Sequence, residues 1–325
     1  MTERGQLAVV STEDSAYFAE SIMKSLNSLG VQSELIEVQR RKFKNGEPDL
    51  KLNIPSLDHL KGRDILIVGS THTDPALLEI MRLGIGLATT YQTRRRIFAI
   101  PFFGCSTMER VKEAGEIATG LASGEMLASL PGGEANVFLF LDLHSEKLLA
   151  PFNGRTQNLT ITPLLLSLIK GQILQQNPGK RLTIVAADKS RFIQAQTFAK
   201  DLGVGAAYVD KIRHHDQVKA RELVGEVAGT YAVIVDDMAR SVDGTAVKAY
   251  QQVMKSGALG GWVVLNHFAV DHPCTAHSLL TLKIFGILTS NSHPEAEGHS
   301  FKHSPKSTIL DAGPVYAQRI AELVI

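Results

Sequence analysis

The chain has 325 residues, of which 44% are hydrophobic and 21% are charged. This composition is typical of a globular protein and excludes disorder, a collagen helix or a coiled coil as the main class. The 34 Lys and Arg residues nearly balance the 33 Asp and Glu residues, so the charge gives no sign of a protein that binds nucleic acid or a membrane surface. At about 150 residues per domain, the length predicts two domains or one larger α/β unit.

The cysteines and the N-terminal segment indicate a cellular compartment. Cys105 and Cys274 are too few for a disulfide framework, and we expect both to be packed as small hydrophobic residues in a reducing environment. The apolar run Leu7–Val10 is shorter than that of a signal peptide, and no stretch reaches the ~18 apolar residues of a membrane span. We therefore expect a soluble, cytoplasmic protein.

Short apolar runs alternate with longer helical patterns along the chain. The predicted strands are Leu7–Val10, Ile65–Val68, Ile97–Ile100, Val137–Leu141, Leu182–Ala186, Ala206–Val209, Ala232–Val235, Trp262–Leu265 and Ile284–Leu288. Several are unbroken apolar runs, which is typical of strands buried on both faces of a parallel sheet. The predicted helices are Asp14–Leu29, Ala76–Tyr91, Glu116–Leu130, Leu164–Gln176, Gly244–Ser256 and Val315–Leu323. This alternation predicts doubly wound α/β layers.

The two halves of the chain look alike. V-F-L-F-L-D-L-H (Val137–His144) and V-I-V-D-D-M (Val233–Met238) are both apolar strands that end in acid. Ligands of open α/β sheets lie outside the carboxyl ends of strands, so these acids are candidate site residues. The polar stretch Pro151–Pro163 is the predicted domain boundary, and Asn291–Thr308 is expected to be an exposed loop.

Asp236 and Asp237 give the sharpest local signal. They end an apolar strand, and Ser241–Thr245 follows before a helical pattern. Such a loop directs N–H groups and hydroxyls at a phosphate, assisted by the helix N-terminus. The paired carboxylates could hold ribose hydroxyls or a hydrated Mg²⁺ ion. An ordinary capped turn explains the dipeptide about equally well.

Other charged residues also follow predicted strands. Alternation places Asp142 and His144 on one side of an extended segment, where both could face a metal-bound triphosphate. Asp188 follows another strand. Lys211 and Arg213 lie two positions apart and could clamp a transferring phosphoryl group. A structural histidine and a solvated cationic edge are the plain alternatives.

F-K-N-G-E (Phe43–Glu47) has turn chemistry at Asn45-Gly46 and predicts a hairpin. Phe43 could contact a nucleobase, although an ordinary hairpin is favoured from this segment alone. Trp262 lies in a predicted buried strand and is expected in the core. The sequence contains no G-x-x-x-x-G-K-S/T loop, no G-x-G-x-x-G motif and no histidine spacing typical of zinc.

Taken in order, these segments resemble ribose-phosphate diphosphokinases, also called phosphoribosyl pyrophosphate (PRPP) synthetases. The matching segments are F-K-N-G-E (Phe43–Glu47), P-F-F-G (Pro101–Gly104), D-L-H-S (Asp142–Ser145), Asp188, V-D-K-I-R (Val209–Arg213), V-I-V-D-D-M (Val233–Met238) and T-S-N-S (Thr289–Ser292). T-M-E-R (Thr107–Arg110) is similar to the T-x-E-R of the plant-type branch. Together the motifs cover the chain from about Phe43 to Ser292.

The resemblance implies a fold of two duplicated type I phosphoribosyltransferase-like α/β domains with mainly parallel sheets. The expected domains are residues 1–155 and 156–312, with the C-terminal helix 313–325 packed on the first. The active site is expected between the domains, and Phe43–Glu47 is expected to reach the site of a neighbouring subunit in a homo-oligomer.

The resemblance also assigns roles to residues. The implied ATP-binding residues are Phe43, Asn45, Glu47, Thr107, Glu109, Arg110 and His144, and the implied metal ligands for Mg²⁺ are Asp142, His144 and Asp188. The implied ribose-phosphate-binding residues are Asp236, Asp237, Arg240, Ser241, Asp243, Gly244 and Thr245. Lys211 and Arg213 are the implied catalytic residues. The expected partners are ATP and ribose 5-phosphate, with products PRPP and AMP.

Two segments depart from the family pattern. D-D-M-A-R-S-V-D-G-T is one residue longer than the usual D-D-M-I-D-T-G-G-T, with Arg240 in place of an acid and Asp243 in place of a glycine. A-A-D-K-S-R (Ala186–Arg191) replaces S-P-D-x-G-G. Three alternatives therefore stay open: another ribose-bearing acceptor such as ADP-ribose, a non-catalytic regulatory subunit, and a phosphoribosyltransferase that consumes PRPP.

Overall fold

The computed structural model describes residues 6–214, 217–241, 244–270, 280 and 282–324, with the backbone alone at 211–214, 217–221 and 299. The chain divides into two compact units. Unit 1 comprises Met1–Thr160 and Asp311–Ile325, and unit 2 comprises Ile161–Leu310. The division lies close to the boundary expected between residues 155 and 156.

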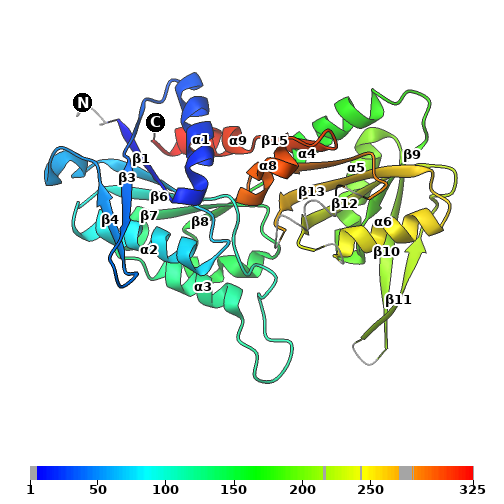
Figure 1. Ribbon diagram of the computed structural model, residues 1–325, viewed down its shortest axis with the longest axis horizontal. Coiled ribbons are helices and arrows are strands. Elements are labelled where there is room, and N and C mark those ends of the chain that lie inside the picture. The colour runs from blue at the N-terminus through cyan, green and yellow to red at the C-terminus, as the bar shows by residue number, and fades with distance from the viewer. Residues whose placement is uncertain (1–5, 215–216, 242–243, 271–279, 281, 325) are drawn as a thin grey trace. The chain divides into compact units, whose positions relative to one another are not determined.

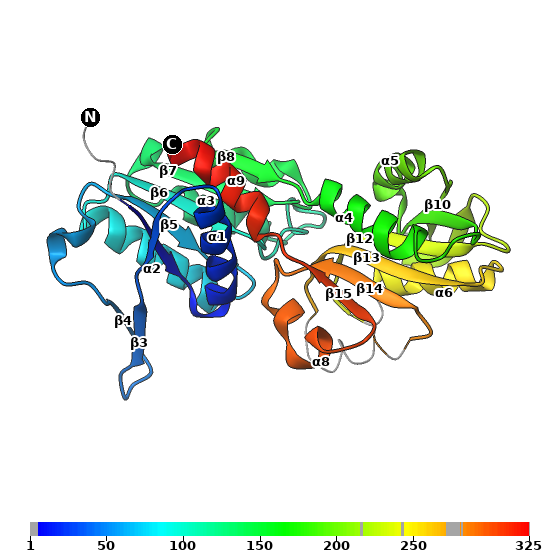
Figure 2. The same cartoon turned by 90° about the horizontal axis from the view of Figure 1, so that it is seen from above.

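Unit 1 is built on a parallel sheet in the order β2-β1-β5-β6-β7-β8 (Figures 1 and 2). Its strands are β1 (Leu7–Ser11), β2 (Ser33–Leu35), β5 (Asp64–Val68), β6 (Arg95–Ile100), β7 (Asn136–Leu141) and β8 (Thr156–Leu159). Every residue of β1 and β5 is buried. Burial on both faces explains why these strands are unbroken apolar runs.

Four helices longer than two turns pack in unit 1. They are α1 (Ala16–Ser28), α2 (Asp74–Thr89), α3 (Thr119–Ala128) and α9 (Gly313–Val324), and the shorter 3₁₀ helices are η1 (Glu13–Ser15), η2 (Leu57–Leu60), η3 (Gly133–Ala135) and η4 (Glu146–Phe152). The C-terminal helix α9 packs against α1 (Figure 2). The rings of Phe18 and Tyr316 meet edge to face at 5.5 Å, and Ser21 Oγ donates to Asp311 Oδ1 at 2.7 Å. These contacts join the two ends of the chain in one core.

A two-stranded antiparallel hairpin, β3 (Val38–Lys42) and β4 (Pro48–Leu52), belongs to unit 1. Phe43 N donates to Glu47 O at 2.9 Å, and Gly46 N donates to Phe43 O at 2.8 Å. Gly46 has φ +88°, a conformation that favours glycine. The hairpin predicted from Asn45-Gly46 is confirmed.

Unit 2 is built on a sheet in the order β11-β10-β9-β12-β13-β14-β15, parallel except for the β10–β11 pair. Its strands are β9 (Leu182–Ala186), β10 (Gly205–His214), β11 (Gln217–Val224), β12 (Tyr231–Ala239), β13 (Gly260–Phe268), β14 (Gly286–Ser290) and β15 (Ser307–Leu310). Its helices are α4 (Thr162–Leu168), the π-helix η5 (Ile169–Leu174), η6 (Lys189–Arg191), α5 (Phe192–Leu202), α6 (Thr245–Lys255), η7 (Pro294–Glu297) and α8 (His299–Lys302). The predicted α/β class is thus confirmed.

Two local expectations are wrong. Asn291–Thr308 is not an exposed loop, because it contains η7, α8 and the start of β15, and Ser292 and Phe301 are buried. Ser292 Oγ has partners in the interior, since it lies 2.8 Å from Ser290 Oγ and 2.7 Å from His267 Nδ1. Polar residues can therefore be buried here at little cost. Cys105 is exposed rather than packed, since it lies at φ +57° in the loop after β6, and Cys274 lies outside the described residues.

Candidate functional site

Asp236 and Asp237 lie near the carboxyl end of β12 in unit 2, and each is only 6% exposed. Each carboxylate accepts the N–H of the following residue: Asp237 N donates to Asp236 Oδ1, and Met238 N to Asp237 Oδ1, both at 2.9 Å. Val235, which precedes the two acids, is in register with Ala186 on β9 and Val264 on β13. Because β12 is the middle strand of the sheet, the acids lie at the centre of the sheet edge. This is the edge at which open α/β sheets bind ligands.

Arg191 neutralises one of the two acids. Its Nη2 lies 2.7 Å from Asp237 Oδ2, in an ion pair whose side chains are 23% and 9% exposed. Burial raises the pKa of Asp236 well above its ordinary range, and the negative charges of Asp237 and Asp188 raise it further. The pair therefore consists of an Asp237 in contact with Arg191 beside an Asp236 that favours its protonated form. A neutral carboxyl can donate one hydrogen bond as well as accept others.

Asp188 begins the 3₁₀ turn η6 directly after β9. Its side chain accepts hydrogen bonds from Ser190 N at 3.0 Å and Ser190 Oγ at 2.5 Å. Because β9 and β12 are adjacent parallel strands, the loops that follow them are neighbours. The structure thus brings together Asp188, Arg191, Asp236 and Asp237, of which sequence analysis missed Arg191 as a site residue.

The predicted phosphate loop leads from β12 into α6. Gly244 N donates to Ser241 O at 2.9 Å, and Gly244 is the residue that caps α6 before Thr245. The α6 N-terminus directs its first N–H groups toward this loop. Arg240 is exposed, and its Nε lies 3.3 Å from Met238 Sδ. Asp243 lies outside the described residues.

Lys211 and Arg213 lie within β10, which runs to His214 and pairs with β11. The strand register shifts between Ile212 and Arg213. Their side chains lie outside the described part of the chain. The predicted pairing of the two cations on one face therefore stays a prediction.

The unit 1 sheet has its own polar carboxyl edge. The P-F-F-G segment follows β6 and packs closely on the loop after β5: Gly104 N donates to Thr71 Oγ1 at 2.8 Å. A Cβ at Gly104 would lie 2.0 Å from Thr71 O, so only glycine fits. This anchor fixes the start of the loop that carries Thr107, Glu109 and Arg110. Glu109 Oε1 lies 3.5 Å from Arg110 Nε, whereas Glu109 Oε2 is buried and has no hydrogen-bond partner among the described residues.

Asp142 and His144 follow β7, the strand next to β6. Asp142 has φ +41°, so the extended chain ends at Leu141 and the expected alternation of Asp142 with His144 does not hold. Positive φ is several-fold enriched for Asp and Asn because their short polar side chains tolerate it. His144 is exposed and Asp142 half-buried.

Tyr316 of α9 supports this edge and was not predicted. Its ring is fully buried, and its hydroxyl donates to Ile100 O at 3.0 Å, at the end of β6. Burial raises the pKa of Tyr316, and the charge of Asp142 raises it further. A tyrosine in a C-terminal helix carries no local signal for this contact, since the two residues are 216 positions apart.

The hairpin tip presents Phe43, Asn45 and Glu47 to solvent. The Phe43 side chain is 60% exposed, and Asn45 Oδ1 accepts the N–H of Glu47 at 3.2 Å. The Phe43 ring is therefore accessible to another molecule.

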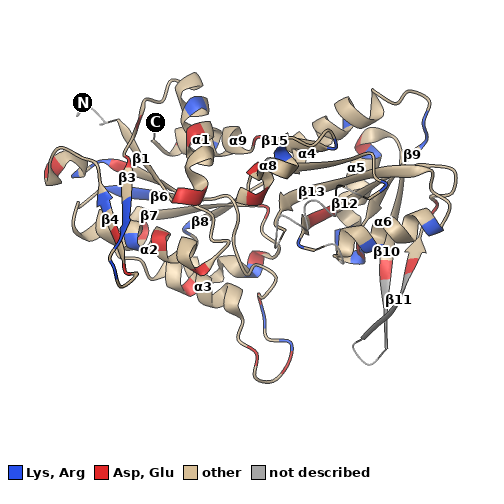
Figure 3. Cartoon of the chain, in the orientation of Figure 1, with Lys and Arg blue, Asp and Glu red and all other residues tan. Residues whose placement is uncertain are grey.

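The three predicted metal ligands are not a cluster within either unit. Asp142 and His144 belong to unit 1, and Asp188 belongs to unit 2. The described residues contain no group of three or more His, Cys, Asp or Glu side chains placed to hold a metal ion. Both charge signs are interspersed over both units (Figure 3). No helix in the described ranges has the length and apolar character needed to cross a membrane.

Comparisons with known proteins identify relatives of both units. Residues 7–129 match the family described as the N-terminal domain of ribose phosphate pyrophosphokinase. Ribose-phosphate pyrophosphokinase of Ralstonia nicotianae is 28% identical over 243 residues, covering 74% of this chain and 71% of that protein. Ribose-phosphate pyrophosphokinase 1, chloroplastic, of Oryza sativa subsp. japonica is 27% identical over 291 residues, covering 88% and 69%.

A solved structure shares the fold of nearly the whole chain. The phosphoribosylpyrophosphate synthetase from Mycobacterium smegmatis superposes with a TM-score of 0.83 at 20% identity, covering 98% of this chain and 99% of that one. The chain therefore shares the α/β fold of that protein.

Proposed function

We propose that the chain is a ribose-phosphate pyrophosphokinase, which transfers the β,γ-diphosphate of ATP to the 1-hydroxyl of ribose 5-phosphate; its likeness to proteins of that name supports this. The hydroxyl oxygen attacks the β-phosphorus, the bond from that phosphorus to the α,β-bridging oxygen breaks, and AMP leaves. PRPP forms and the hydroxyl proton is released. The observation that carries the proposal is the buried pair Asp236–Asp237 at a strand end, directly before a loop and helix of phosphate-binding type.

Unit 2 supplies the acceptor side in this proposal. Asp236 and Asp237 hold the ribose hydroxyls, and the N–H groups between Ser241 and Thr245 hold the 5-phosphate. Arg191 contacts Asp237 Oδ2 and orients this carboxylate, which accepts hydrogen bonds from ribose. Arg240, Asp243 and Gly244 complete this side by resemblance to the family.

The nucleotide is bound by unit 1 residues and by the hairpin of another subunit. Thr107, Glu109, Arg110 and His144 follow neighbouring strands β6 and β7, and Phe43, Asn45 and Glu47 lie on the exposed tip. The exposed Phe43 ring supports a contact with the nucleotide of another subunit, because a base stacked on the ring would cover apolar surface that otherwise faces water. We propose a homo-oligomer with sites shared between subunits.

Lys211 and Arg213 neutralise charge on the transferring group. Phosphoryl transfer depends on positioning and charge stabilisation, so no protein nucleophile is required. Both residues lie in the β10–β11 hairpin, which extends beyond the central strands of the sheet. A hairpin of this kind can carry cations to a bound triphosphate.

The donor atoms present fit Mg²⁺. This ion keeps several waters and binds through one or two carboxylates together with substrate phosphates, so it needs no cluster of three side chains. Each unit offers one carboxylate that would hold such an ion, Asp142 in unit 1 and Asp188 in unit 2, while the imidazole of His144 suits a phosphate contact better than Mg²⁺. When bound, the ion neutralises triphosphate charge.

Product analysis tests the proposal. The purified protein with ATP, Mg²⁺ and ribose 5-phosphate should release AMP, and omitting the acceptor or chelating the metal should stop the release. ADP as the nucleotide product, or no AMP with any ribose acceptor, would refute the diphosphoryl transfer.

A second acceptor is favoured by one observation. Arg191 occupies a position that is glycine in the family pattern, and it brings a guanidinium to the ribose side of the site. Together with Arg240 it suits an acceptor with more negative charge, such as ADP-ribose. Comparing kcat/KM for ribose 5-phosphate and ADP-ribose decides between them, and a large preference for ribose 5-phosphate that Arg191→Gly leaves unchanged would exclude the second acceptor.

A further inference from the structure

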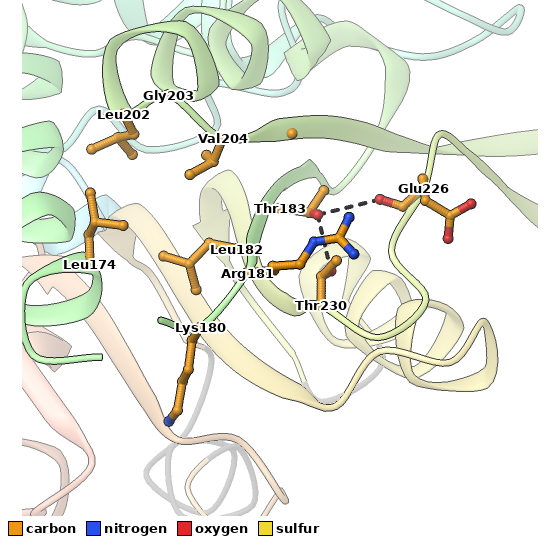
Figure 4. A pocket seen from close by; sticks show the side chains of 11 residues that line it. Leu174, Lys180, Arg181, Leu182, Thr183, Leu202, Gly203, Val204, Glu226 and Thr230 are labelled. Atoms are coloured by element: carbon orange, nitrogen blue, oxygen red, sulfur yellow. Dashed lines mark hydrogen bonds between the residues drawn. The ribbon is translucent and has the colours of Figure 1, made fainter. Parts of the chain in front are cut away.

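A cavity of about 470 Å³ lies in unit 2 at the amino edge of the sheet, opposite the edge that carries Asp236 and Asp237 (Figure 4). Leu182 and Gly205, the first residues of β9 and β10, line it. The volume is typical of small-molecule pockets. Because the strands run parallel, this cavity is separated from the carboxyl-edge site by the length of the strands.

One half of the cavity is apolar. Leu174, Leu182, Leu202 and Val204 gather on one side in Figure 4. Leu174, Leu202 and Val204 are half-buried, so part of their apolar surface remains open to a ligand. Gly205 has no side chain to fill the space, although a Cβ there would make only ordinary contacts, 3.5 Å from Thr183 Oγ1. These four aliphatic side chains can cover an apolar group of a ligand.

The other half contains an available cation. Figure 4 shows the Arg181 side chain reaching past Thr183 and Thr230, whereas Lys180 extends away. Lys180 Nζ is engaged elsewhere, 2.7 Å from Asn177 Oδ1 and 4.6 Å from the centre of the Tyr231 ring. Within the described ranges the guanidinium of Arg181 has no ion-pair or hydrogen-bond partner. A guanidinium matches the two oxygens of a phosphate or carboxylate.

The remaining polar groups restrict the ligand further. The hydroxyls of Thr183 and Thr230 lie 3.0 Å apart, and Thr230 Oγ1 also donates to Val227 O at 2.8 Å, so these hydroxyls satisfy each other. Glu226 Oε1 accepts the N–H of Ala228 at 2.9 Å, which uses one of about four lone-pair positions of the carboxylate. Glu226 can therefore accept hydrogen bonds from ligand hydroxyls.

We propose that this cavity is a second small-molecule site, which binds a nucleoside 5′-monophosphate. The phosphate pairs with Arg181, the ribose hydroxyls donate to Glu226, and the base packs against the leucines. The site is independent of the proposed reaction, since no residue that lines it belongs to the carboxyl-edge site.

Hydrogen exchange of the full-length protein with AMP as the probe locates this binding, even though AMP is also the expected product at the other site. AMP should protect the amides of residues 200–205 from exchange. In Arg181→Ala, the AMP concentration that gives half-maximal protection should rise by about 10- to 150-fold, the usual loss for a hydrogen bond to a charged group. Lys180→Ala is the matched control and should leave the protection unchanged. Gly205→Ile, which fills the cavity without a backbone clash, should abolish it.

Several outcomes would overturn the proposal. The first is that AMP does not protect residues 200–205 of the unmodified protein. The second is that AMP protects Arg181→Ala and Gly205→Ile as well as it protects the unmodified protein. The third is that adenosine or inorganic phosphate alone protects these residues as well as AMP does. AMP release from ATP should persist in both variants. A protein that shows the protection but releases no AMP would refute only the proposed function.

Discussion

The carboxyl edges of the two sheets differ in how far their polar groups are fixed within the chain. In unit 2, Asp236 and Asp237 are buried, and Asp237 is bound to Arg191 at 2.7 Å. In unit 1, His144 is exposed and Phe43 is 60% exposed on a hairpin tip. In the proposed reaction, the side that binds the ribose acceptor is therefore formed by buried residues, whereas the side that binds the nucleotide has exposed residues. Mutations on the two sides should therefore separate stability from binding.

The largest effect is expected outside both edges, at the β10–β11 hairpin. If Lys211 and Arg213 act on the transferring group, Lys211→Ala and Arg213→Ala should each lower kcat by about 10²–10³ with little change in KM. Steady-state kinetics of AMP release measures this. A change confined to KM would move the two cations from the transition state to substrate binding.

Phe43→Ala tests the exposed hairpin tip of unit 1. Loss of stacking on the base should weaken ATP binding by about 1–3 kcal/mol, by analogy with stacking on nucleic-acid bases. Calorimetric ATP titration measures the loss, and thermal unfolding should not change because the ring is exposed. Leu57→Ala, which also truncates an exposed apolar side chain, is the control. Equal ATP affinity in both variants would remove Phe43 from the site.

Arg191→Met tests the buried acids at the carboxyl edge of unit 2. Removing the guanidinium leaves the buried Asp237 carboxylate unpaired, so the free energy of unfolding should fall by about 2 kcal/mol. Lys189→Met changes an exposed cation of the same loop and should be nearly neutral. Urea unfolding compares the two variants, and equal stabilities would mean that the ion pair contributes little.

Asp236 gives the smallest effect, a change in the pH dependence of stability. Because its pKa is raised in the folded protein, the folded state keeps a proton that the unfolded chain loses, and the unfolding free energy falls as pH rises above the ordinary Asp range. Asp236→Asn should make this slope shallower, by at most about 1.4 kcal/mol per pH unit. Urea unfolding from pH 4 to 7 with EDTA measures it, with the exposed Asp58→Asn as control. Parallel slopes for Asp236→Asn and the unmodified protein would contradict the raised pKa.

The sequence predicts the strands of this fold well because burial on both faces demands continuous apolar runs. Leu182–Ala186 is recovered with the same bounds, and Trp262 is buried as expected. The short edge strand β15 (Ser307–Leu310) is not predicted from the sequence, because it is half-buried and begins with polar residues. Ser292 was predicted to lie in a loop because its contacts with Ser290 and His267, which permit burial, cannot be seen in a local pattern.

The candidate site was predictable where its residues follow one another along the chain. Asp236 and Asp237 precede their loop and helix directly. Arg191 was not predictable as their partner, because its contact depends on β9 lying next to β12, across 46 positions in the chain (237 − 191). Tyr316 is more remote still, since its contact requires α9 to pack on the first unit.

The position of the new phosphorus–oxygen bond tests the central claim most directly. After incubation with ATP, Mg²⁺ and ribose 5-phosphate, phosphorus NMR of the products should show AMP and a ribose with its original 5-phosphate and a diphosphate on carbon 1. A diphosphate on another carbon, or a single phosphate on carbon 1 together with ADP, would contradict the account.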